Sequence, residues 1–112
     1  MIPYGRQDVN QDDIAAVLRV LRSDFLTTGP EVELFESELE NITGSPTITV
    51  SSGTAALHTV FANIGLKPGD EVISTPMTFV ATQATISLVG AKNIFVDIEK
   101  ETGLIDIQKV RK

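Results

Sequence analysis

The residues best suited to chemistry lie where a predicted strand turns into a predicted helix, within residues 47–57. Thr47–Val50 is β-branched throughout, which predicts a buried strand. Ser51 or Ser52 can cap the following helix, and Gly53 lets another group approach the backbone closely. Such a helix start presents free backbone N–H groups and a partial positive charge, which together favour an anion. We interpret Gly53, Thr54 and Ala55 as a phosphate-binding turn. The alternative is a capped helix that binds nothing.

Alternating helices and strands would position this turn. The helix that follows it has apolar residues at i, i+3, i+4 and i+7, which are Leu57, Val60, Phe61 and Ile64. Strands are expected at Glu71–Thr75 and Lys92–Ile98. Between them we expect a helix at Phe79–Val89 capped by Thr78, and a further helix after Asp106. The order β-α-β-α-β predicts an α/β fold, with a parallel or mixed sheet covered by helices.

Two helices are expected before the turn. The first begins at Asn10, a good capping residue, and has an apolar stripe formed by Ile14, Val17, Leu18 and Leu21. The second begins at Pro30, which suits the first helical position, and ends at Gly44. Its acidic residues are expected to form a solvated face; they are Glu31, Glu33, Glu36, Glu38 and Glu40.

The loop between these helices, residues 23–29, carries two large apolar side chains. Phe25 and Leu26 can plug a gap in the core, or they can line a pocket into which the hydroxyls of Thr27 and Thr28 point. Loops carry function disproportionately often, but the residues alone favour the plug.

Composition excludes several classes of function. The 112 residues suit one small globular domain, with 42% hydrophobic and 21% charged residues. A formal charge of -6 argues against nucleic acid or an anionic membrane as the main partner. Without cysteine there is no disulfide, thiolate metal site or cysteine nucleophile, and a single histidine makes a zinc site unfavourable. Neither a membrane span nor a signal pattern is present, so a cytoplasmic location is expected.

An ordered series of short motifs carries a resemblance to a known family. The motifs are Pro3–Gly5, Leu26–Pro30 before a helix with Phe35–Glu36, Ser51–Leu57, Pro68–Ile73, Thr75–Thr82, Val96–Ile98 and Thr102–Asp106. The series resembles the N-terminal third of the DegT/DnrJ/EryC1/StrS family of nucleotide-sugar aminotransferases. The opening is most similar to transaminases of the pseudaminic acid pathway, and similar chains are assigned to spore coat polysaccharide biosynthesis. The resemblance implies the aspartate aminotransferase fold (fold type I), with residues 1–112 as a truncated N-terminal segment of the large domain.

The resemblance also implies a role for individual residues. Gly53, Thr54 and Ala55 match the turn that holds the phosphate of pyridoxal 5'-phosphate. Phe79 matches the aromatic residue that stacks on the pyridine ring, and stacking against a flat ring is physically favourable. The positions that match the lining of the sugar-nucleotide pocket are Tyr4, Asp24, Phe25, Leu26 and Thr27.

No residue of the chain matches the family's catalytic lysine, which the resemblance places beyond Lys112. A pyridoxal enzyme needs such a lysine as nucleophile and base, so we expect this chain to be inactive alone. His58 is expected to be an ordinary helix residue without a catalytic role. The intact enzyme would transfer an amine, with glutamate as the expected donor, to a nucleotide-linked keto sugar, and would be a homodimer.

Two alternatives stay open on the sequence. A few family members use the pyridoxamine form of the cofactor to dehydrate deoxysugars, with histidine in place of the lysine. The second alternative is a small α/β binding module without catalytic activity. If the chain is a fragment, helix faces that have lost their cover would promote self-association.

Overall fold

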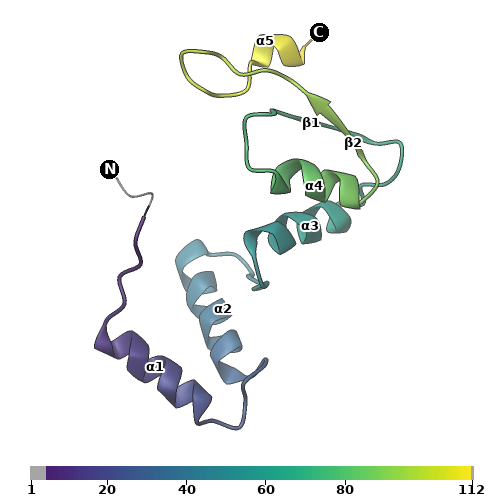
Figure 1. Ribbon diagram of the computed structural model, residues 1–112. Helices are drawn as coiled ribbons and strands as arrows, with labels where there is room; N and C mark the ends of the chain where they lie inside the picture. The colour runs from purple at the N-terminus through teal and green to yellow at the C-terminus, as the bar shows by residue number, and fades with distance from the viewer. Residues whose placement is uncertain (1–4, 112) are drawn as a thin grey trace. The chain divides into compact units, whose positions relative to one another are not determined.

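The computed structural model describes residues 5–111, and Tyr4 therefore lies outside the described residues. Within this range the order of elements is α1, α2, α3, β1, α4, β2 and α5. The chain divides into two compact units, Met1–Thr49 and Val50–Lys112. The first unit contains α1 and α2, and the second contains the sheet with the remaining helices (Figure 1).

Helix α1, Gln11–Leu21, begins as the sequence predicts. The side chain of Asn10 accepts hydrogen bonds from the backbone N–H groups of Asp12 (2.7 Å) and Asp13 (3.2 Å). In return, the Asp13 carboxylate accepts a bond of 2.9 Å from the backbone N–H of Asn10. This reciprocal arrangement satisfies donors that a helix start otherwise leaves free, and it fixes the first turn.

Helix α2, Pro30–Thr43, lies between the predicted boundary residues. Pro30 occupies the first turn, and Gly44 ends the helix in the left-handed conformation with φ +68°. Glycine adopts this conformation without the steric penalty that a Cβ brings, which is why it ends helices so often.

The strand predicted at Thr47–Val50 is wrong, because these residues form no strand in the structure. A strand needs a neighbour for its backbone groups, and within residues 5–111 the sheet contains only β1 and β2. Instead, carboxylates of α2 accept hydrogen bonds from backbone N–H groups of this segment. Glu36 Oε1 accepts the Thr49 N–H (2.7 Å) and hydroxyl (2.8 Å), and Glu40 accepts the Thr47 N–H (3.0 Å).

The second unit is built around a β-α-β element. Strands β1, Glu71–Ser74, and β2, Lys92–Phe95, pair in parallel, with Glu71 opposite Lys92 and Ser74 opposite Phe95. Helix α4, Ala81–Leu88, connects them and packs on both strands, and α3, Gly53–Asn63, packs on α4 (Figure 1). The parallel pairing confirms the predicted α/β class.

The core of this unit lies around α4. Ile86 and Thr85 are fully buried, and Ala81, Ala91 and Val96 are nearly so. The Thr85 hydroxyl donates to the Ala81 carbonyl at 2.7 Å, which satisfies a polar group that burial would otherwise penalise.

Two predicted boundaries in this unit are wrong. Helix α4 begins at Ala81 rather than Phe79, and the Thr78 hydroxyl lies 3.3 Å from that of Thr82 instead of capping the helix. Strand β2 ends at Phe95, although Ile98 forms an isolated antiparallel bridge farther along the chain. The last helix, α5, Ile107–Val110, begins after Asp106 as predicted, with the carboxylate capping it.

The apolar faces of the outer helices are largely exposed. In α1 all four residues of the predicted stripe are exposed, and so are Leu57 and Val60 of α3 and the C-cap residue Ile64. None of the helices in residues 5–111 has the length and apolar character that crossing a bilayer requires. The predicted self-association of such faces stays a prediction.

Candidate functional site

The turn that enters α3 has the backbone geometry of an anion site. Ser52 caps the helix from an extended conformation (φ -164°, ψ 162°), and its Oγ accepts the Ala55 N–H at 3.1 Å. The Ala56 N–H donates to the Ser52 carbonyl at 3.0 Å. In the part of the chain that the structure describes, the N–H groups of Gly53 and Thr54 have no hydrogen-bond acceptor. Of the three residues predicted to hold a phosphate, these two therefore retain free backbone donors.

The surroundings of these donors suit a phosphate. A Cβ built on Gly53 would meet no atom within 4 Å, so the space beside this residue is open. No acidic residue lies in the first turn of α3, and Gly53 and Thr54 are both exposed. An anion can therefore reach the positive end of an 11-residue helix without repulsion from a carboxylate in that helix's own first turn.

The turn lies toward the edge of the sheet where ligands of α/β proteins usually bind. Helix α4 follows the carboxyl end of β1, so its N-terminus lies at that edge. The C-terminus of α3 leads into the amino end of β1, and α3 therefore begins toward the opposite, carboxyl side (Figure 1). Crevices at the carboxyl ends of parallel strands are the common ligand sites of this architecture.

Phe79 lies in the connection from β1 to α4, residues 75–80, with 74% of its surface exposed. The connection itself is fixed by hydrogen bonds. The Gln83 side chain donates to the Thr75 carbonyl (2.9 Å), and the Thr82 N–H donates to the Phe79 carbonyl (3.1 Å). An exposed ring on an anchored backbone has a face free for stacking, so the role assigned to Phe79 remains a consistent prediction.

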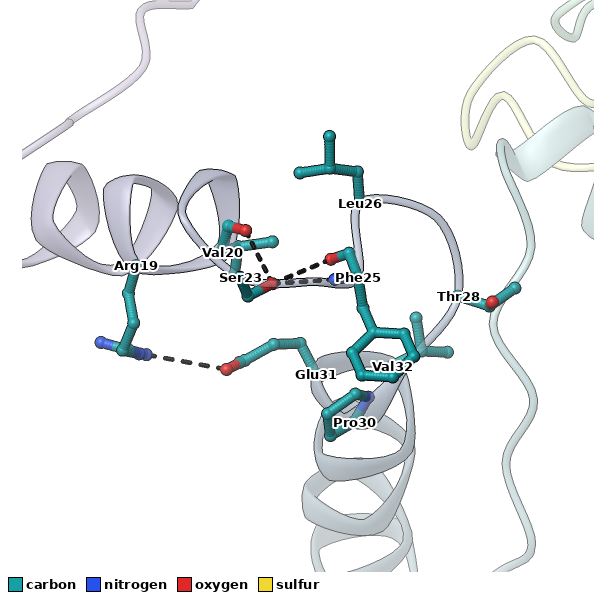
Figure 2. A pocket seen from close by; sticks show the side chains of 9 residues that line it. All are labelled: Arg19, Val20, Ser23, Phe25, Leu26, Thr28, Pro30, Glu31 and Val32. Atoms are coloured by element: carbon teal, nitrogen blue, oxygen red, sulfur yellow. Dashed lines mark hydrogen bonds and ion pairs between the residues drawn. The ribbon is translucent and has the colours of Figure 1, made fainter.

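The four residues predicted to line a sugar-nucleotide pocket, residues 24–27, belong to the first unit. A hollow of about 180 Å³ lies there between the end of α1 and the start of α2 (Figure 2). Phe25 and Leu26 line it, whereas Asp24 and Thr27 do not. The remaining lining residues are Arg19, Val20, Ser23, Thr28, Pro30, Glu31 and Val32. Phe25 and Leu26 thus border a hollow, and more than half of the surface of each is exposed. This exposure disfavours the interpretation that they fill a gap in the core.

Sequence reasoning missed the helix residues that line this hollow. Arg19 and Glu31 approach each other across it, with 3.9 Å between the guanidinium and a carboxylate oxygen (Figure 2). Both side chains are more than half exposed, so this ion pair adds little to stability. The sequence feature that could have indicated these two residues is their position at the two helix ends that flank an apolar loop.

Charged groups with shifted pKa values lie outside the turn that enters α3. Hydrogen bonds from the backbone and the hydroxyl of Thr49 lower the pKa of Glu36 below its usual 4.5. The pKa of Asp97 is lowered by the backbone N–H of Ile98 and by nearby Lys109. Lys92 pairs with Glu71 at 2.8 Å. Lys92 and Lys109 thus form ion pairs with surface carboxylates. Within residues 5–111, no group of three or more His, Asp or Glu side chains could hold a metal ion.

Residues 7–112 match the DegT/DnrJ/EryC1/StrS aminotransferase family. A curated relative is UDP-4-amino-4-deoxy-L-arabinose–oxoglutarate aminotransferase of Shewanella sediminis, which is 42% identical over 107 residues. That match covers 95% of this chain and 28% of the relative.

Solved structures show the same relationship. Spr1654 of Streptococcus pneumoniae, assigned as a sugar aminotransferase, is 36% identical with a TM-score of 0.91, and it is solved in PLP and PMP forms. The match covers 97% of this chain and 28% of that one. The aminotransferase PseC of Helicobacter pylori, involved in pseudaminic acid biosynthesis, is 34% identical with a TM-score of 0.84, over 93% of this chain and 29% of its own. The chain thus spans under a third of the length of these relatives, and its fold is that of the fold type I sugar aminotransferases.

Proposed function

Because the chain belongs to the DegT/DnrJ/EryC1/StrS aminotransferase family, we propose that it supplies the cofactor-phosphate and substrate-binding part of a pyridoxal-phosphate-dependent nucleotide-sugar aminotransferase. The observation that carries the proposal is the pair of free N–H donors, from Gly53 and Thr54, at the start of α3. Residues 1–112 would be the N-terminal segment of the catalytic domain and inactive alone, since they match only 28% of the curated relative.

Each part of the chain has a separate task in this proposal. Pyridoxal phosphate, when bound, supplies an electron sink for moving the amine. Gly53 and Thr54 donate backbone hydrogen bonds to its phosphate, and the helix end adds a favourable field. Phe79 covers one face of the ring and keeps water from it. Phe25 and Leu26 present an apolar wall to the nucleotide sugar, while Tyr4, Asp24, Thr27 and Ala55 stay candidates by resemblance.

The proposed substrates follow from the relatives. The amine acceptor would be a nucleotide-linked keto sugar, with glutamate as the amine donor, in polysaccharide biosynthesis in the cytoplasm. The enzyme would be a homodimer. The exposed apolar faces of α1 and α3 support burial by further protein, because large exposed apolar surfaces favour association.

The glutamate half-reaction tests the proposed function. The full-length protein, read from the gene that encodes this chain, is loaded with pyridoxal phosphate and mixed with L-glutamate. We expect the visible absorbance of the bound aldehyde cofactor to disappear as the amine form and 2-oxoglutarate appear. The 112-residue chain alone, treated identically, should produce none.

The alternatives give different results. A full-length protein that binds the cofactor but does not exchange with glutamate, and instead consumes a deoxysugar nucleotide with the pyridoxamine form, would be a dehydratase. Absence of any cofactor binding would contradict both enzymatic functions and leave a binding module.

A further inference from the structure

The loop that borders the hollow of the first unit has an unusual backbone at its end. Thr28 has φ +55°, and in residues 5–111 it is the one residue other than glycine with positive φ. Gly29 follows with φ +114°, a conformation that side-chain-bearing residues rarely adopt. Two consecutive residues of this kind turn the chain sharply into α2, which begins at Pro30.

The sharp turn brings Phe25 against the backbone of Gly29. A Cβ built on Gly29 would lie 2.8 Å from Phe25 Cβ and 3.2 Å from Phe25 Cγ. The nearer contact is closer than real Cβ atoms approach one another, so one of the two residues would have to move. Phe25 can lie at this place only because residue 29 has no side chain.

Phe25 cannot easily yield, since its backbone is anchored on both sides. Ser23 Oγ accepts the Phe25 N–H at 3.2 Å and lies 3.1 Å from the Phe25 carbonyl (Figure 2). The same hydroxyl lies 2.8 Å from the carbonyl of Val20, at the end of α1. A displaced Phe25 would therefore break these bonds or shift the ring that lines the hollow.

We propose that Gly29 is a positioning residue for substrate: by lacking a Cβ it lets Phe25 hold its ring as a wall of the hollow where a UDP-linked amino sugar binds. The inference rests on the proposed function, and the substrate class is that in the name of the Shewanella relative. Gly29 acts through Phe25 and has no part in binding the cofactor phosphate.

The chain offers a matched control at the other end of the same helix. Gly44 also has positive φ (+68°), but a Cβ there would meet no atom within 4 Å. Gly44→Ala therefore adds a methyl group to a left-handed residue without a clash, whereas Gly29→Ala adds both the clash with Phe25 and the greater backbone strain of a side chain at φ +114°.

The test measures amine transfer from UDP-4-amino-4-deoxy-L-arabinose to 2-oxoglutarate by the full-length protein. For Gly29→Ala we expect KM for the sugar nucleotide to rise about tenfold with kcat and pyridoxal phosphate affinity unchanged. Gly44→Ala should keep the wild-type KM. In the Phe25→Gly background, Gly29→Ala should raise KM little further, because neither the Cβ that it would strike nor the ring remains at position 25.

Four outcomes would overturn the inference. They are an unchanged KM in Gly29→Ala, an equal rise in Gly44→Ala, simple additivity with Phe25→Gly, and a wild-type protein that exchanges with glutamate but takes no amine from this sugar. If Gly29→Ala does not fold, Phe25→Ala must raise KM on its own for the inference to stand. A wild-type protein that fails the glutamate half-reaction instead contradicts the proposed function, and the inference falls with it.

Discussion

Replacing Gly53 with proline would remove one of the two free N–H donors while leaving the helix intact. Gly53 occupies the first position of α3, where proline is favoured, and its φ is not positive. Ser52 before it is extended, the conformation that a residue preceding proline requires. A side chain at position 53 also enters open space. The substitution thus removes a single hydrogen-bond donor and puts the proline Cδ in its place.

The expected loss is at least that of one hydrogen bond to a charged phosphate. Such bonds contribute about 1.5–3 kcal/mol, so the affinity for pyridoxal phosphate should fall by about 10- to 150-fold in Gly53→Pro. The free energy of unfolding without cofactor should be unchanged or rise by up to about 1 kcal/mol, because proline restricts the unfolded chain. Weaker binding together with undiminished stability distinguishes a lost ligand contact from a damaged fold.

The assay is a spectroscopic titration of the full-length apoprotein with pyridoxal phosphate and, separately, with pyridoxal. Gly53→Ala is the control, because it retains the N–H and its Cβ meets no neighbour. We expect Gly53→Pro to weaken binding of the phosphorylated compound alone, and Gly53→Ala to bind like the wild type. Equal affinities of Gly53→Pro and Gly53→Ala for pyridoxal phosphate would refute the assignment of this N–H to the phosphate.

Three further predictions concern neighbouring features. Ser52→Ala should lower the free energy of unfolding by about 1 kcal/mol through loss of the helix cap, whereas Ser51→Ala should change it by less than about 0.5 kcal/mol, as denaturant titration would show. Phe79→Leu should weaken binding of pyridoxal phosphate and of pyridoxal alike by roughly 2- to 12-fold, and equal binding by the variant would contradict stacking. The lowered pKa of Glu36 means that its stabilisation is complete above pH 4.5 and is lost as pH falls through the lower folded value. Wild-type stability should therefore exceed that of Glu36→Gln at neutral pH and converge with it well below pH 4.5, while Glu38→Gln should match the wild type throughout.

Local chemistry allowed the starts of α1, α2, α3 and α5 and the end of α2 to be predicted from the sequence, whereas the predicted Thr78 cap of α4 is not formed. Asn10 and Ser52 cap helices with bonds to residues two or three positions away, and Gly44 ends one without help from distant residues. Interactions of this range depend mainly on the residue types, so the turn that we propose to bind phosphate could be placed at a helix start from the sequence.

Features that depend on contacts between residues distant in the chain could not be predicted from local residue types. The β-branched run Thr47–Val50 has the composition of a strand, but strand formation requires a paired neighbour. Glu36 looked like one of several solvated acids, yet it bonds Thr49, 13 positions away. The contact between Phe25 and Gly29 likewise depends on the turn geometry, which no periodicity reveals.

The most direct test of the central claim is a crystal structure of the full-length protein with pyridoxal phosphate. We predict that phosphate oxygens lie within hydrogen-bonding distance of the backbone nitrogens of Gly53 and Thr54, with the ring of Phe79 against the pyridine ring. A cofactor phosphate bound elsewhere, with these two N–H groups still lacking an acceptor, would contradict the assignment of the α3 turn as the phosphate site.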